Sequence, residues 1–144
     1  MNACLKGKAP ILLEAYHSTN PKANWNDFTN ECQQGYNDVQ DQLKQDQGNL
    51  SCLCEIDTKA GFGVGNDDFR VEHFHPKSDS NPSNYNWALD WENMLGCCHG
   101  GSEKYVTDVK SRYISEKSER LSDVLKANCN LDDEILNPLK IIII

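Results

Sequence analysis

The residues able to do chemistry cluster in the middle of the chain. Positions 51–100 hold three of the four histidines, four of the seven cysteines and eight acidic residues. Glu72 and His73 stand side by side in this region, shortly before Pro76. A histidine titrates near neutral pH and is the usual general base, while a carboxylate beside it suits a hard cation such as Mg²⁺. The pair therefore has the composition needed to hydrolyse a phosphodiester, which requires a base for water and a cation beside the phosphate.

Position along a strand decides whether these two side chains can work together. Phe69–His75 is an extended stretch closed by a proline. Adjacent residues on a β-strand point to opposite faces, so Glu72 and His73 share a site only if the strand bends or ends there. Pro76 predicts such an ending. Asn93, twenty residues beyond His73, is expected to bridge backbone groups and fix the loop that bears the histidine.

The cysteines of the middle region are candidate metal ligands. Cys52 and Cys54 precede the Glu-His pair, and Cys98 follows it. In a reducing compartment, such crowding indicates metal binding before disulfide formation. Cys97 or His99 could complete a four-ligand zinc site. The alternative is that these cysteines are small buried hydrophobic residues, and that His99 merely follows a cysteine.

Four sequence elements occur in a fixed order through this region. They are Cys52–Glu55, Val71–Ser78, Trp91–Cys98 and Asn137-Pro138. This order resembles the HNH endonuclease family of Septu-type anti-phage systems (PtuB), including its members attached to retrons. That family has a Cys-x-x-Cys-Glu element, then Val/Ile-Glu-His-Phe-x-Pro-Lys-Ser, then Trp-x-Asn-Leu-Leu-Gly-x-Cys, and a distal Asn-Pro. The resemblance covers roughly residues 50–138, and agreement in order and spacing is more specific than one short motif.

The resemblance implies a fold and a role for each matching residue. His73 matches the general base, and Glu72 matches the acidic ligand of a catalytic Mg²⁺ or Mn²⁺. Asn93 matches the middle asparagine that braces the hairpin, and Cys54 and Cys98 match cysteines that bind structural zinc. The implied fold class is α+β and mainly helical, with a ββα-metal HNH core, N-terminal helices and zinc as a staple.

The chain also departs from the family pattern. The family spacing would put a cysteine at Ser51, whereas the chain has Cys-x-Cys at Cys52 and Cys54. The late His-Cys-Asp-x-x-Lys element of the family has only Glu116 and Lys117 as counterparts. The third catalytic ligand is therefore unassigned, and loss of zinc from this chain stays open.

We expect two parts, a helical segment at residues 1–50 and a nuclease core at residues 51–140. Apolar residues recur at steps of three or four through Trp25–Gln47, which predicts one helix. Asn24 is the expected N-cap, and Gly48 the expected stop. The other predicted helices cover Ile11–His17, Glu103–Tyr113 and Ser118–Ala127.

Charge and hydropathy exclude some classes of protein. The net charge is −8 and the mean hydropathy −0.66. No apolar run approaches the ~20 residues of a membrane span, and we expect a cytoplasmic protein without a secretory signal. A free-standing nucleic-acid binder usually carries a basic stripe, so a partner should supply the positive surface. The resemblance names that partner as an ABC/SMC-like ATPase (PtuA), joined in retrons by a reverse transcriptase and its RNA–DNA product (msDNA).

The leading hypothesis is a metal-dependent HNH endonuclease subunit of a bacterial anti-phage complex. The first alternative is a non-catalytic, zinc-stapled adaptor of the same complex, because the late element is degenerate. The second is an acidic decoy that mimics nucleic acid, although a decoy needs no Glu-His pair and no cysteines. The choice between DNA and RNA as substrate stays open.

Overall fold

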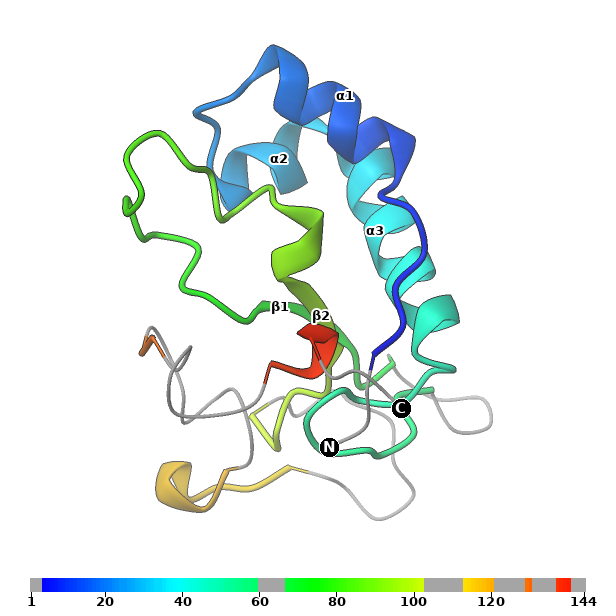
Figure 1. The fold of residues 1–144 in the computed structure, drawn as a ribbon. Helices are drawn as coiled ribbons and strands as arrows, with labels where there is room; N and C mark the ends of the chain where they lie inside the picture. Colours follow the sequence, from blue (N-terminus) through cyan, green and yellow to red (C-terminus); the bar gives the residue numbers. More distant parts are fainter. Residues whose placement is uncertain (1–3, 60–66, 103–112, 121–128, 131–136, 141–144) are drawn as a thin grey trace.

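The computed structural model describes residues 4–59, 67–102, 113–120, 129–130 and 137–140. Three α-helices precede a two-stranded antiparallel sheet, an arrangement compatible with an α+β fold of the HNH kind (Figure 1). The helices are α1 (Ile11–Thr19), α2 (Trp25–Glu31) and α3 (Gln33–Asp46), and the strands are β1 (Arg70–His73) and β2 (Met94–Cys97). Short 3₁₀ helices cover Trp91–Asn93 (η1), Lys117–Glu119 (η2) and Pro138–Lys140 (η3).

The predicted helix over Trp25–Gln47 is wrong in one respect, because it is two helices. Cys32 leaves the helical conformation, with φ −128° and ψ 63°, and separates α2 from α3. Gly35 permits the close packing at this break, since a Cβ there would lie 2.7 Å from Cys32 Sγ and 3.1 Å from Phe28 Cε2. The spacing of apolar residues cannot reveal a single non-helical residue, because the apolar residues of α2 and α3 keep the same helical spacing on both sides of Cys32.

The start and end of this helical region agree with the sequence prediction. Asn24 caps α2 by accepting hydrogen bonds from the backbone of Asn26 and Asp27, and the Asp27 side chain accepts from the Asn24 backbone in return. This reciprocal pair is a capping box, which satisfies amides that the first helical turn leaves without partners. At the other end, Gly48 takes φ +59°, a conformation that glycine adopts without steric cost.

The hairpin pairs residues far apart in the sequence. Arg70 lies opposite Cys97, and His73 lies opposite Met94. Gly96 lets the ring of Phe69 approach the sheet, because a Cβ at this position would lie 2.5 Å from Phe69 Cε2. The extended stretch predicted at Phe69–His75 is therefore confirmed, with its paired part ending at His73.

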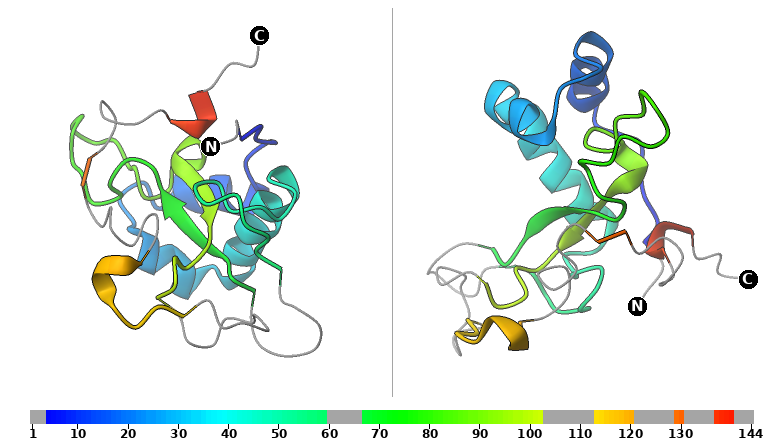
Figure 2. Two further views of the ribbon diagram at one scale, coloured as in Figure 1. Left: turned by 90° about the horizontal axis from the view of Figure 1, so that it is seen from below. Right: turned by 90° about the vertical axis from the view of Figure 1, so that its left-hand side faces the viewer.

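One hydrophobic cluster joins the helices to the hairpin. Its buried members are Leu13, Phe28, Val39, Leu43, Phe69, Leu89, Trp91 and Met94. In the right-hand view of Figure 2, the three helices lie above the hairpin and η2 lies below it. Trp25, at the start of α2, packs against this cluster and contacts the ring of His73, the last residue of β1.

Several expected features lie outside the described residues. The helix predicted at Glu103–Tyr113 lies outside them except for Tyr113. The helix predicted at Ser118–Ala127 lies outside them from residue 121 onward, and so do residues 141–144. The helix predicted at Ile11–His17 is confirmed as α1, which extends to Thr19. Among the described helices, none is long and apolar enough to cross a bilayer.

Candidate active site

His73 ends β1 with its imidazole ring held from two sides. The ring is 4% exposed, and its edge meets the Trp25 ring at a centroid distance of 4.9 Å. Nε2 lies 3.0 Å from the carbonyl oxygen of Ala88. A carbonyl only accepts hydrogen bonds, so the proton of the neutral ring is on Nε2 and the lone pair is on Nδ1. The contact therefore selects the tautomer in which Nδ1 is the basic nitrogen.

The Ala88 carbonyl is itself held in place. The Ala88 backbone N–H donates to the side-chain oxygen of Asn86 at 3.1 Å. The Asn86 side-chain amide donates to the carbonyls of Ala23 at 2.8 Å and Pro21 at 3.1 Å. The link between α1 and α2 thus positions the loop that orients the His73 ring.

Asn93 bridges the end of β1 to the start of β2. Its side-chain amide donates to the carbonyls of His75 at 3.0 Å and Trp87 at 2.9 Å. Its side-chain oxygen accepts from the His75 backbone N–H at 2.7 Å, and its own carbonyl accepts from the Phe74 N–H at 2.9 Å. Asn93 is 4% exposed, so these bonds form away from bulk water. They fix the turn that begins directly after His73.

Glu72 stands apart from the His73 ring. Glu72 pairs with Leu95 in the ladder, and His73 pairs with Met94, so regular pairing continues through both residues. Alternation along the strand places their side chains on opposite faces. Glu72 lies on the face of Arg70, with 4.0 Å between Oε2 and Nη2. The bend expected from the sequence comes after His73, and the two side chains do not converge.

The predicted zinc ligands fall into three separate contacts. Cys52 Sγ lies 2.8 Å from Cys4 Sγ, the Cys54 thiol hydrogen-bonds the Cys98 thiol, and His99 Nδ1 lies 3.0 Å from Asp68 Oδ1. Burial raises the pKa of Cys98 to about 11, which opposes the thiolate form that binds metal. Within residues 4–59, 67–102, 113–120, 129–130 and 137–140, no group of three or more His, Cys, Asp or Glu side chains is arranged to hold a metal ion.

Ser51 lies beside one of these thiol pairs. Its hydroxyl oxygen accepts from the Cys98 backbone N–H at 3.1 Å and from the Cys54 N–H at 3.4 Å. Ser51 is 1% exposed. The position at which the resembling family has a cysteine therefore converges with Cys54 and Cys98, whereas Cys52 contacts the N-terminal segment instead.

A second histidine near the site was not assigned a role from the sequence. His75 Nε2 donates to Asp79 Oδ2 at 2.8 Å, and its ring stacks on Trp87 with 3.9 Å between centroids. The hydrogen bond from His75 holds the pKa of Asp79 below its usual value. The spacing His-x-x-x-Asp around Pro76 was the available signal for this pair.

Lys6 is another residue that the sequence did not single out. Its ammonium group donates to the carbonyls of Trp91 and Met94, the latter at 2.8 Å. It also lies 3.7 Å from the centroid of the Trp91 ring. Desolvation lowers the pKa of Lys6 to about 8, against the opposing influence of nearby carboxylates. Lys6 thus ties the N-terminal segment to both ends of the turn that contains Asn93.

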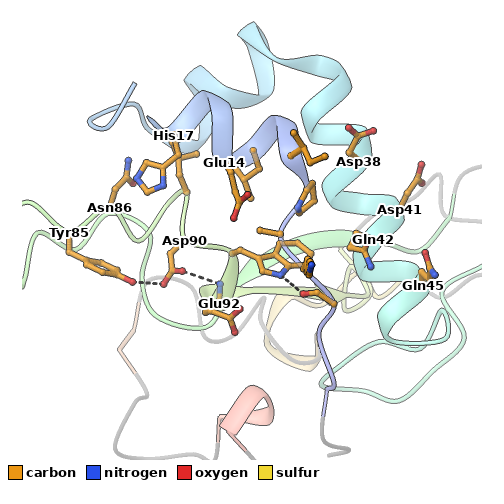
Figure 3. Close-up of a pocket in the computed structure, with 18 of the residues that line it drawn as sticks. Glu14, His17, Asp38, Asp41, Gln42, Gln45, Tyr85, Asn86, Asp90 and Glu92 are labelled. Atoms are coloured by element: carbon orange, nitrogen blue, oxygen red, sulfur yellow. Dashed lines mark hydrogen bonds between the residues drawn. The ribbon is translucent and has the colours of Figure 1, made fainter. Parts of the chain in front are cut away.

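A groove of about 1210 Å³ lies between α1, α3 and the segment 84–92 (Figure 3). Its acidic lining residues are Glu14, Asp38, Asp41, Asp90 and Glu92. Lys8 and His17 are its basic ones. Five carboxylates repel a phosphate backbone, so this groove is not suited to the substrate of a nuclease.

Comparison with known proteins gives one informative similarity. No family model matches the chain, and no solved structure matches it. The chain is 36% identical over 89 residues to an Escherichia coli protein named "Retron Ec83 putative HNH endonuclease". The similarity supports an HNH endonuclease relationship. The match covers 60% of this chain and 33% of the relative, so the chain spans about a third of the length of that protein.

Proposed function

We propose that this chain is the nuclease subunit of a bacterial anti-phage complex of the Septu or retron type, hydrolysing phosphodiester bonds with His73 as general base. The observation that carries the proposal is the hydrogen bond from His73 Nε2 to the Ala88 carbonyl, because it leaves Nδ1 as the basic nitrogen. The similarity to a retron protein named as an HNH endonuclease supports the same class of activity.

In the proposed reaction, His73 Nδ1 takes a proton from the water whose oxygen bonds to phosphorus. The bond from phosphorus to the leaving ester oxygen breaks, and that oxygen takes a proton from solvent. The ring then carries a positive charge, and Nε2 continues to donate to Ala88. A hydrogen bond from a charged donor is stronger than one from a neutral donor, so this contact favours the protonated product of the step. Asn93 holds the turn after His73 and keeps the ring at one position relative to the hairpin.

A catalytic Mg²⁺ or Mn²⁺ and a structural zinc belong to the proposal through the sequence resemblance. A divalent cation would supply charge stabilisation on the phosphate and leaving oxygen. Glu72 is the residue that the resemblance assigns to it, but the described residues do not assemble a ligand set around Glu72. The same holds for zinc at Cys52, Cys54, Cys98 and His99.

The proposed partners follow from charge and from the resemblance. A chain of net charge −8 repels nucleic acid, so a partner with a positive surface is needed for tight substrate binding. The resemblance names an ABC/SMC-like ATPase (PtuA). The name of the E. coli relative refers to a retron, which adds a reverse transcriptase and its msDNA as candidate partners.

A non-catalytic adaptor is the second candidate function. It is favoured by the burial of His73, which is 4% exposed, and by the alternation that places the Glu72 and His73 side chains on opposite faces of the strand. An adaptor needs neither an accessible base nor a shared cation. It predicts complex formation without cleavage.

The test is a cleavage assay on the chain co-purified with the products of its neighbouring genes. Phage DNA and cellular RNA are incubated with Mg²⁺ or Mn²⁺, with wild type compared with His73→Ala and with His17→Ala as a matched control. We expect cleavage by wild type and His17→Ala, and none by His73→Ala. Equal cleavage by His73→Ala, or no cleavage by any form in the intact complex, contradicts the proposal.

A further inference from the structure

A second hollow, of about 330 Å³, lies next to the acidic groove and shares Asn84, Tyr85 and Asn86 with it. Its lining includes Lys22, Lys77, Tyr85, Trp87 and Ala88. Ala88 is the residue whose carbonyl accepts the hydrogen bond from His73. The hollow is therefore bordered by the residue that orients the His73 ring.

The charge of this hollow is opposite to that of the groove. Lys22 and Lys77 are exposed, and the carboxylate in the lining is Asp79, which already accepts a hydrogen bond from His75. The rest of the lining is mainly amide, hydroxyl and aromatic side chains. Two lysines at the edge of a hollow attract a phosphate, even in a chain of net negative charge.

Aromatic rings form a ladder along the same hollow. The outermost ring is Tyr85, which is 46% exposed and lies 4.5 Å from the Trp87 ring. Trp87 in turn stacks on the buried ring of His75 at 3.9 Å. Trp91, by contrast, is 6% exposed and belongs to the hydrophobic cluster, so the exposed aromatic surface is at Tyr85.

The ladder is held rigidly. The Tyr85 hydroxyl donates to Asp90 Oδ2 at 2.8 Å, and Trp87 Nε1 donates to the Asn81 carbonyl at 3.0 Å. The Trp87 carbonyl accepts from Asn93, which also fixes the turn after His73. The hydrogen bonds of Asn93 thus place the aromatic platform and the His73 turn in one rigid unit.

We propose that this hollow binds one nucleotide of a single-stranded stretch of the substrate, with the base stacked on Tyr85 and a phosphate beside Lys22 and Lys77. Basic groups combined with exposed aromatic rings are the usual means of binding single-stranded nucleic acid, and stacking tolerates any base. The inference rests on the proposed function, since it takes nucleic acid as the substrate. It adds a surface for the strand beside the loop that orients His73.

The test measures binding without cleavage. Short fluorescently labelled oligo-dT and oligo-U are titrated with the full chain, as the purified complex, without added divalent cation. Fluorescence anisotropy gives the dissociation constant at several salt concentrations. The two oligonucleotides distinguish DNA from RNA as the source of the strand.

The variants separate charge from stacking. We expect the double variant Lys22→Ala, Lys77→Ala to weaken binding at least about tenfold and to reduce the salt dependence, as removal of phosphate contacts does. We expect Tyr85→Ala to weaken binding about five- to hundredfold and Tyr85→Phe to keep it, since a phenyl ring stacks equally well. Lys8→Ala, in the acidic groove, is the matched control and should bind like wild type.

Two results would overturn the proposal. One is wild-type affinity in the double lysine variant or in Tyr85→Ala. The other is a loss in Lys8→Ala as large as in the double variant, since the effect would then be general charge. Failure of the proposed function has a different signature, namely the expected pattern of binding in a complex that cleaves neither DNA nor RNA.

Discussion

Asn93 and His75 exchange two hydrogen bonds across the turn that ends β1. The Asn93 side chain donates to the His75 carbonyl at 3.0 Å and accepts from the His75 N–H at 2.7 Å. These residues are eighteen positions apart, and the exchange replaces the strand pairing that stops at His73. The candidate catalytic histidine, His73, is therefore the last residue of the regular strand pairing. The two Asn93–His75 hydrogen bonds fix the backbone directly after it.

Replacing Asn93 should destabilise the fold. Asn93→Ala leaves a buried N–H of His75 and the carbonyls of His75 and Trp87 without their partners, and each unsatisfied buried group costs about 1–3 kcal/mol. We expect the free energy of unfolding to fall by about 3 kcal/mol or more, measured by urea denaturation. Asn30→Ala, on the exposed face of α2, is the control and should change it by less than about 0.5 kcal/mol. An equal loss of unfolding free energy in both variants would show that the Asn93 hydrogen bonds make no specific contribution to stability.

Lys6 should make stability depend on pH in the alkaline range. Its pKa is about 8 in the folded chain, below its ordinary value of 10.5, because of desolvation. Between these two values the unfolded chain binds more protons than the folded one, so Lys6's contribution to the free energy of unfolding rises with pH. Below pH 8 both states are protonated, and the contribution no longer changes.

The variant Lys6→Met isolates this effect. We expect the stability difference, wild type minus Lys6→Met, to increase by about 1–3 kcal/mol between pH 8 and pH 10.5. Urea denaturation at a series of pH values measures it. Lys8→Met, which replaces an exposed lysine two residues away, should give a difference that is flat with pH. A flat profile for Lys6→Met as well would mean that the Lys6 ammonium is not desolvated.

Ser51 should limit zinc binding. Its hydroxyl lies beside the backbone amides of Cys54 and Cys98, whose thiols are paired. Ser51→Cys would add a third thiol to this pair, and zinc favours thiolate ligands. We expect zinc affinity, measured by competition with a chromogenic chelator, to rise at least about tenfold. Ser78→Cys, an exposed position, controls for an added thiol, and equal affinities in both variants would contradict the expectation.

Local signals predicted local structure well. The cap at Asn24 was predictable because Asp27 follows at the spacing that a capping box needs. The strand Arg70–His73 was predictable because it lies in an extended stretch that ends at a proline. The break at Cys32 was not, because it depends on how Gly35 and Phe28 pack in three dimensions. Spacing along the chain carries no information about that contact.

The site was predictable only as a set of residue types. His73 and Asn93 come together through hairpin pairing, which the motif order implied. The side chains of Glu72 and His73 do not converge. Strand pairing continues through both residues, so neighbours in sequence point to opposite faces of the sheet. Lys6 was missed since its partners Trp91 and Met94 are more than eighty positions away, and no local pattern marks a lysine that donates to backbone carbonyls.

The most direct test of the central claim compares two histidines in one assay. His73 and His75 are both buried and both hydrogen-bonded, but the His73 ring donates to the backbone carbonyl of Ala88, whereas the His75 ring donates to the Asp79 carboxylate. The cleavage rate of the intact complex under single-turnover conditions should fall about 10²–10⁴-fold in His73→Ala, the contribution typical of a general base. It should fall far less in His75→Ala. A larger loss in His75→Ala than in His73→Ala, with both variants folded, would contradict the assignment of His73 as the base.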